Sequence, residues 1–233
     1  MAPFLFLSKY DPVGPAVMVV LFGIATIYLV YQLGKEFFGI KAGMITAFLY
    51  AISPIVIIYS RASWNPNVFP FFTISSLYTL YKAVSKNKTS LFFLSGFLMG
   101  INLQIHYLAT FVGGIMFAYV LLVDFVPNSK WFIETIKRYL LMFSGFLIGF
   151  SPFILFELRH SFTNSKNIVQ FIFNSSDTGA GGQAISQIEH VFTRLFGGLI
   201  LSFPLFSNFK NFDLDIINIW QFASIALGLT ATA

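Results

Sequence analysis

The chain has 233 residues, of which 57% are hydrophobic and 10% charged, and its formal net charge is +5. About 25% of the residues of a soluble globular domain are charged, so this composition excludes such a domain and indicates an integral membrane protein. The cations occur in ones and twos between apolar segments, which is typical of topology signals and argues against a nucleic-acid partner. The absence of cysteine excludes disulfides and thiolate metal sites.

Apolar segments of membrane-spanning length recur along the chain. A helix of about 20 residues rises about 30 Å, which matches the hydrocarbon core of a bilayer. Residues 91–125 are too many for one span and too few for two full ones, so we interpret them as a tight pair of short helices divided by the polar stretch from Asn102 to Tyr107. The segments are residues 13–33, 42–60, 68–81, the pair within 91–125, 139–158 and 216–233.

The segments between these spans complete the predicted fold. Residues 124–138 are expected to form a connector, and residues 159–215 an outer-face loop region. Within that region, residues 187–206 mix Glu189 and Arg194 with apolar side chains, which is typical of an interfacial helix. The sequence therefore predicts an all-α protein, a single polytopic transmembrane helix bundle over residues 1–233 with about 6–8 membrane helices.

Three pairs of glycines are separated by four residues, about one helical turn. This spacing lets two helix backbones approach closely, so we interpret the pairs as packing surfaces. They are Gly39 with Gly43, Gly96 with Gly100, and Gly145 with Gly149.

The distribution of cations between the connectors predicts the orientation in the membrane. Three short connectors on one side contain eight of them, namely Lys35, Lys41, Lys82, Lys86, Lys88, Lys130, Lys137 and Arg138. The other side has six in longer segments, namely Lys9, Arg61, Arg159, Lys166, Arg194 and Lys210. Because short cytoplasmic loops are enriched in Lys and Arg, we expect the first set in the cytoplasm and the amino terminus outside.

Polar and titratable side chains are expected to gather on the outer side. Cations and imidazoles together with one carboxylate suit a phosphate-bearing ligand, since Arg binds phosphate in a bidentate manner and His is a tunable donor or base. The candidate lipid-phosphate and substrate-binding residues are Arg61, Asn65, His106, Tyr107, Glu157, Arg159 and His160. The alternative for Arg61 and Arg159 is that they only reach from helix ends to lipid headgroups.

Several short motifs, in order, resemble a known family. They are GKEFFGIKAG at 34–43, AISP at 51–54, YSR at 59–61, GFLMG at 96–100, QIHY at 104–107, SPF at 151–153 and FELRH at 156–160. This series is similar to polytopic glycosyltransferases of the GT-C superfamily, the relatives of protein mannosyltransferases in family 39, and it covers residues 13–175.

The resemblance implies transfer of a sugar from a polyprenyl-phosphate donor to an acceptor on the outer face of the cell membrane, with an acidic residue as base. In that family the acid lies in the first outer loop, after the first span. The chain begins at what resembles the second span, so we expect a fragment without that loop. Asp11 is the one acid near the position, but it directly precedes a helix, and the catalytic residue stays unassigned. We expect no cofactor, and a divalent metal stays open.

A polytopic transporter or lipid flippase subunit without transferase chemistry is the alternative function. Inverted repeats and helices broken at mid-membrane would favour it. The Ser53–Pro54 and Ser151–Pro152 pairs are alike, but both lie on spans that cross the membrane in the same direction, whereas inverted repeats would place them on spans of opposite direction. The transferase interpretation is therefore preferred.

Overall fold

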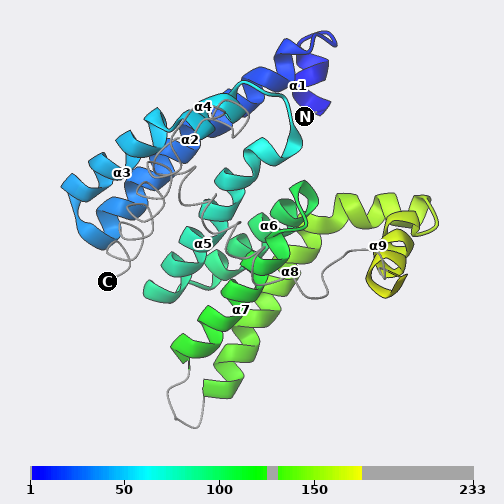
Figure 1. Ribbon diagram of the computed structural model, residues 1–233. Coiled ribbons are helices and arrows are strands. Elements are labelled where there is room, and N and C mark those ends of the chain that lie inside the picture. Colours follow the sequence, from blue (N-terminus) through cyan, green and yellow to red (C-terminus); the bar gives the residue numbers. More distant parts are fainter. Residues whose placement is uncertain (1, 125–130, 175–233) are drawn as a thin grey trace, which may run out of the picture. The chain divides into compact units, whose positions relative to one another are not determined.

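The computed structural model describes residues 2–124 and 131–174 (Figure 1). Within these residues the secondary structure is helical, without a strand, which confirms the all-α prediction. The helices are α1 (Ala2–Leu7), α2 (Val13–Phe38), α3 (Ile40–Ile52), α4 (Pro54–Ser60), the short 3-10 helix η1 (Asn65–Val68), α5 (Phe69–Ser85), α6 (Thr89–Ile105), α7 (Ala109–Asp124), α8 (Trp131–Arg159) and α9 (Thr163–Asn174).

Several of these helices are suited to a membrane. In the described part of the chain, α2 and α8 are long and apolar enough to cross a bilayer, and α3 with α4 makes a third span if the two count as one. The two are interrupted at Ser53, directly before Pro54, and are bent by 59°, since proline cannot continue the hydrogen bonding of the preceding helix. α6 and α7 are shorter apolar helices and form the predicted pair. The expected interfacial helix at 187–206 and the last span at 216–233 lie outside the described residues.

The chain forms two compact units, residues 1–51 with 59–166 and residues 52–58 with 167–233. Among the described residues, the second unit contains most of α4 and the last part of α9. Every contact discussed below lies within the first unit.

Tight turns join consecutive helices of the first unit. Gly39 separates α2 from α3 with a φ of 89°, a conformation that glycine adopts without steric cost. Asn87 has a φ of 46° in the turn between α5 and α6, and asparagine is among the few other residues that tolerate this region. At His106 the backbone becomes extended, which ends α6 and leads into α7. The predicted division of residues 91–125 is thereby confirmed.

The tightest packing in the first unit joins α6 to α8 through glycines. A methyl group added at Gly96 would overlap the Met142 carbonyl, and one at Gly145 would overlap the Phe93 carbonyl. Gly100 and Gly149 also approach the facing backbone too closely for a methyl group, one turn further along. Because residues further along α6 contact residues further along α8, the two helices run parallel. The packing role predicted for these two glycine pairs is confirmed.

Polar side chains inside this packing bond to neighbouring helices. Asn102 is fully buried and donates a hydrogen bond to the Thr73 hydroxyl on α5 at 3.0 Å. Gln104 donates to the Gly149 carbonyl on α8 at 2.6 Å. The polar stretch at the end of α6 therefore joins three helices, as expected where unpaired polar groups are costly.

The described parts of the three lysine-rich connectors meet at one end of the first unit, which we call the lysine-rich end. Lys82 of α5 forms an ion pair with Glu36 of α2 at 2.6 Å. Arg138 of α8 donates a hydrogen bond to Asn87, in the turn after α5, at 3.1 Å. These two contacts link the first connector to the second and the second to the third.

The prediction of a connector over residues 124–138 is wrong in its second half, because α8 begins at Trp131. The early turns of this helix are stabilised by an ion pair between Glu134 and Lys137, three residues apart, at 3.1 Å. The charged residues of this segment therefore lie in the first turns of a helix and not in a connector. Similarly, the region that begins at residue 159 contains α9.

Candidate substrate site

The end of the first unit opposite the lysine-rich end contains the predicted site residues. Here α2, the chain around η1, and the end of α6 share a small apolar cluster formed by Met18, Val19 and Val68, against which Ile105 packs. Because α5 and α6 are antiparallel and α6 and α8 parallel, the start of α5 and the ends of α6 and α8 lie at this same end (Figure 1). We call it the Arg61 end.

The turn that carries Arg61 is held in shape by one asparagine. The Asn67 amide donates hydrogen bonds to the carbonyls of Tyr59 and Ala62, both at 2.7 Å. Arg61 itself is exposed and makes no hydrogen bond or ion pair within the described part of the chain. Asn65 is also exposed, at the start of η1. The turn is thus ordered while its guanidinium group is available to a ligand.

His106 lies beside this turn at the end of α6. Its ring lies 5.8 Å from that of Phe69 and stacks on Tyr107 at 4.5 Å between centroids. The Leu108 N–H donates to Nδ1 of His106 at 3.2 Å, so Nδ1 is the acceptor and a neutral ring carries its proton on Nε2. His106 therefore presents an N–H donor, next to the 75% exposed Tyr107.

Glu157 has a different environment from the one expected for a substrate-binding carboxylate. Glu157 is 3% exposed. Its carboxylate accepts hydrogen bonds from the Asn164 N–H at 3.3 Å, from the Ser165 N–H at 2.9 Å and from the Ser165 hydroxyl at 2.7 Å. These N–H groups belong to the first turn of α9, which has no earlier turn to bond to them. Glu157 thus caps α9 and links it to α8.

Arg159 and His160 follow Glu157 and are both exposed. Nδ1 of His160 lies 2.8 Å from the Phe156 carbonyl, which can only accept, so Nδ1 carries the proton. In a neutral ring, Nε2 of His160 is then an acceptor. The two histidines of the predicted site consequently present opposite groups, a donor at His106 and an acceptor at His160.

The structure brings some of the predicted residues together. His106 and Tyr107 are in contact, and the Arg61 turn joins the same cluster of helix ends. In the described residues no hydrogen bond or ion pair connects Arg61, His106 and Arg159, and direct convergence of their side chains stays a prediction.

Comparison with known proteins identifies the family. The family model of dolichyl-phosphate-mannose-protein mannosyltransferases matches residues 6–156, well over half of the chain. The chain belongs to this family. No curated protein and no solved structure matches the chain. Membership confirms the GT-C resemblance and makes the chain a membrane glycosyltransferase of the mannosyltransferase-like type.

The family match divides the predicted site. Asp11, Arg61, Asn65, His106 and Tyr107 lie inside the matched segment, whereas Glu157, Arg159 and His160 directly follow it. The residues around the Arg61 turn are thus within the part of the chain that matches the family model.

Asp11 has a structural contact of its own. Its carboxylate accepts a hydrogen bond from the Val13 N–H at 2.8 Å, which caps the start of α2, and the residue is exposed. Among the described residues, no group of three or more His, Asp or Glu side chains is arranged to hold a metal ion.

Asn67 was not among the residues predicted from sequence, although it is the residue that fixes the Arg61 turn. Its position directly after Pro66 is a usable signal, because asparagine side chains often bond to nearby backbone in such turns. Sequence reasoning selected the charged group and missed the amide that positions it.

Proposed function

We propose that the chain binds a polyprenyl-phosphate-linked sugar at the Arg61 end and takes part in transferring that sugar to an acceptor on the outer face of the membrane. The amino terminus and the Arg61 end lie outside in this proposal. The observation that carries it is the Arg61 turn, fixed by Asn67 beside His106, within the segment matched by the mannosyltransferase family.

The proposed chemistry is a displacement at the anomeric carbon of the sugar. An acceptor hydroxyl forms the new C–O bond, the bond from the anomeric carbon to phosphate breaks, and its electron pair leaves with polyprenyl phosphate. The hydroxyl proton goes to a base that stays unassigned, since Asp11 and Glu157 both cap helices through their carboxylates.

The exposed cations suit the leaving phosphate. The planar guanidinium group of Arg61 matches two phosphate oxygens, and the N–H on Nε2 of His106 suits a phosphate or sugar oxygen. Fixed donors aimed at a leaving group that gains charge lower the barrier to its departure. In the proposal, Arg159 supplies a second cation, Asn65 and Tyr107 contact the sugar or acceptor, and His160 presents an acceptor.

The experiment that tests this function compares ligands that differ in one group. The purified full chain in detergent is titrated with polyprenyl-phosphate mannose, with the matching polyprenol and with a nucleotide-linked mannose. We expect polyprenyl-phosphate mannose to bind at least about tenfold more tightly than polyprenol, because a charge-assisted phosphate contact contributes about 1.5–3 kcal/mol. Equal affinity for the two lipids, or preference for the nucleotide sugar, would contradict the proposal.

A further inference from the structure

The last part of α8 leads to three of the predicted site residues and does not continue straight from the rest of the helix. Figure 1 shows that α8 turns near its end. The helix contains Pro152, and Glu157, Arg159 and His160 come after it. Proline is a common cause of such a bend, because it has no N–H and its ring meets the carbonyl four residues earlier. The placement of Arg159 and His160 therefore depends on how α8 is held at Pro152.

The carbonyl that Pro152 leaves without its helical donor is that of Ile148. The Ser151 hydroxyl donates a hydrogen bond to this carbonyl at 2.7 Å. Serine side chains are among the groups that satisfy backbone carbonyls freed by proline in membrane helices. The bend is thus compatible with hydrocarbon surroundings, where an unpaired carbonyl is costly.

Another helix bonds to α8 at almost the same place. The Gln104 amide of α6 donates to the Gly149 carbonyl at 2.6 Å and lies 3.3 Å from the carbonyl of Gly100 in its own helix. Gly149 is three residues before Pro152, so this bond lies in the last turn before the bend. Among the described residues, no hydrogen bond joins α8 to α5, α6 or α7 beyond Gly149. Gln104 therefore makes the final polar link to α8 before the helix turns.

The backbones of α6 and α8 touch at this level. A methyl group added at Gly100 would lie 2.8 Å from the Phe150 nitrogen, and one added at Gly149 would overlap the Phe97 carbonyl. These contacts hold the two helices close together. Since no side chain interlocks at a glycine, they restrict rotation of α8 about its own axis less than a directional hydrogen bond does. The bond from Gln104 supplies that restriction.

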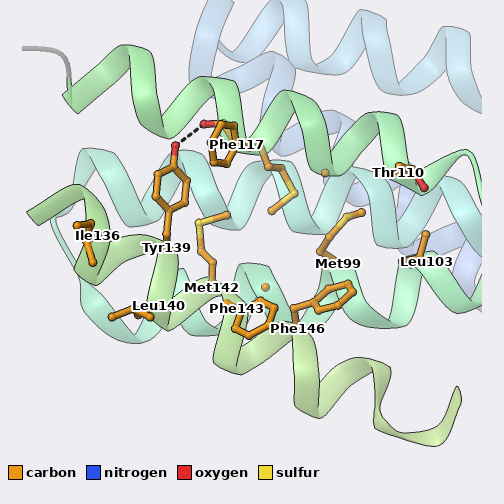
Figure 2. A pocket seen from close by; sticks show the side chains of 13 residues that line it. Met99, Leu103, Thr110, Phe117, Ile136, Tyr139, Leu140, Met142, Phe143 and Phe146 are labelled. Atoms are coloured by element: carbon orange, nitrogen blue, oxygen red, sulfur yellow. Dashed lines mark hydrogen bonds between the residues drawn. The ribbon is translucent and has the colours of Figure 1, made fainter. Parts of the chain in front are cut away.

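Residues next to this bond line an apolar groove of about 580 Å³ between α7 and α8 (Figure 2). Leu103, which directly precedes Gln104, and Phe146, three residues before Gly149, are part of its lining. A hydrogen bond is stronger in apolar surroundings, and an amide or carbonyl that loses its partner there is costly. We therefore expect the bond between Gln104 and Gly149 to be maintained.

Gln104 is also close to the other part of the candidate site. It lies two residues before His106, which ends α6 and presents its Nε2–H. The Gln104 amide thus connects the helix end of His106 to the point from which α8 leads to Arg159 and His160. Within the described part of the chain, no hydrogen bond joins His106 directly to either residue.

We propose that Gln104 is a positioning residue of the candidate substrate site. Its bond to Gly149 fixes the direction of α8 after the bend, and thereby the distance from His106 to Arg159 and His160. The consequence for substrate binding rests on the proposed function, whereas the consequence for the geometry does not.

The geometric part is tested with spin labels on the full chain, which has no cysteine of its own. Leu108→Cys, beside His106, is paired either with Leu158→Cys after the bend or with Leu140→Cys before it, and all three positions are exposed. Pulsed EPR gives the distance distribution of each pair. Gln104→Met keeps the length of the side chain and removes the donor. We expect it to broaden the distribution between positions 108 and 158 and to leave that between 108 and 140 unchanged.

Gln32→Met is the matched control. The Gln32 amide also donates a hydrogen bond at 2.6 Å, but its acceptor is the Tyr28 hydroxyl in the same helix. This variant should leave both distributions unchanged. An unchanged distribution between positions 108 and 158 in Gln104→Met would overturn the proposal. Equal broadening of both pairs would also overturn it, because it would indicate a general loss of packing.

The functional part is tested by the coupling of Gln104 to the two arginines, with polyprenyl phosphate as the ligand. Arg159→Lys should weaken binding by roughly tenfold in the otherwise wild-type chain. It should weaken binding much less in Gln104→Met, where Arg159 is already displaced, whereas Arg61→Lys should have the same effect in both backgrounds. Equal losses from Arg159→Lys in both backgrounds would overturn the positioning role. If the wild type binds no polyprenyl phosphate, the proposed function fails, while the spin-label distances still decide whether Gln104 fixes the bend.

Discussion

The buried carboxylate of Glu157 accepts two hydrogen bonds from Ser165, one from its N–H group at 2.9 Å and one from its hydroxyl at 2.7 Å. Glu157 is near the end of α8 and Ser165 is in the first turn of α9, so this contact fixes how the chain turns after the last described membrane helix. The intervening turn contains Ser161 and Phe162 with φ of 55° and 58°, a left-handed conformation that requires such support.

Removing this carboxylate should loosen the turn. Glu157→Ala leaves the N–H groups of Asn164 and Ser165 without their acceptor, and we expect a lower midpoint of thermal unfolding and severalfold faster proteolysis between residues 160 and 166. Glu134→Ala is the control, because Glu134 belongs to an exposed ion pair. Equal behaviour of the two variants would show that the Glu157 contacts do not hold the turn.

The glycine contacts between α6 and α8 predict a sharp positional difference. Gly145→Ala forces a methyl group into the Phe93 carbonyl. Because this carbonyl belongs to the backbone of α6, it cannot easily move aside, and the substitution should destabilise the protein by about 1–3 kcal/mol. Gly114→Ala adds the same methyl group in open space and should be neutral or slightly stabilising. Thermal unfolding in detergent measures both, and comparable losses would contradict the packing described here.

These two cases show what sequence reasoning can and cannot predict. The spacing of Gly145 and Gly149 indicates a packing surface because a small residue on every turn has one main structural use in a membrane helix. The role of Glu157 was missed because its partner is a serine on the following helix, and no pattern marks a carboxylate that bonds to backbone eight residues later.

The start of α8 was predicted too late for a related reason. Lys137 and Arg138 resemble the charged end of a span, but Lys137 pairs with Glu134 along the helix, and Arg138 packs on Phe92 and bonds to Asn87. These contacts let the helix begin at Trp131. The break at His106 was predicted correctly because helix length and membrane thickness together leave few alternatives.

The ion pair between Glu36 and Lys82 should be measurable by charge reversal. Glu36→Lys and Lys82→Glu each place like charges together, and the double variant restores attraction, so the pair should show a coupling of about 0.5–1 kcal/mol. The more exposed pair of Glu134 and Lys137 is the matched comparison and should show less. Thermal unfolding of both sets of variants gives the coupling energies. A coupling energy near zero for Glu36 and Lys82 would show that this ion pair does not link the first two connectors.

The predicted orientation can be checked on a chain without cysteine. Lys86→Cys lies at the lysine-rich end and Ser63→Cys in the Arg61 turn, and both positions are exposed. We expect an impermeant maleimide on intact cells to label position 63, and position 86 only after the membrane is opened. The reverse pattern would mean that the Arg61 end faces the cytoplasm.

The affinity of arginine variants for polyprenyl phosphate tests the proposed site most directly. Arg61→Lys and Arg159→Lys keep the charge and lose the bidentate geometry, so each should weaken binding by roughly tenfold if the guanidinium groups hold the phosphate. Lys166→Ala, an exposed cation near Arg159, should leave the affinity unchanged. Side chains that only reach lipid headgroups would tolerate lysine equally well. Unchanged affinity in both arginine variants, or an equal loss in Lys166→Ala, would contradict a phosphate site at the Arg61 end.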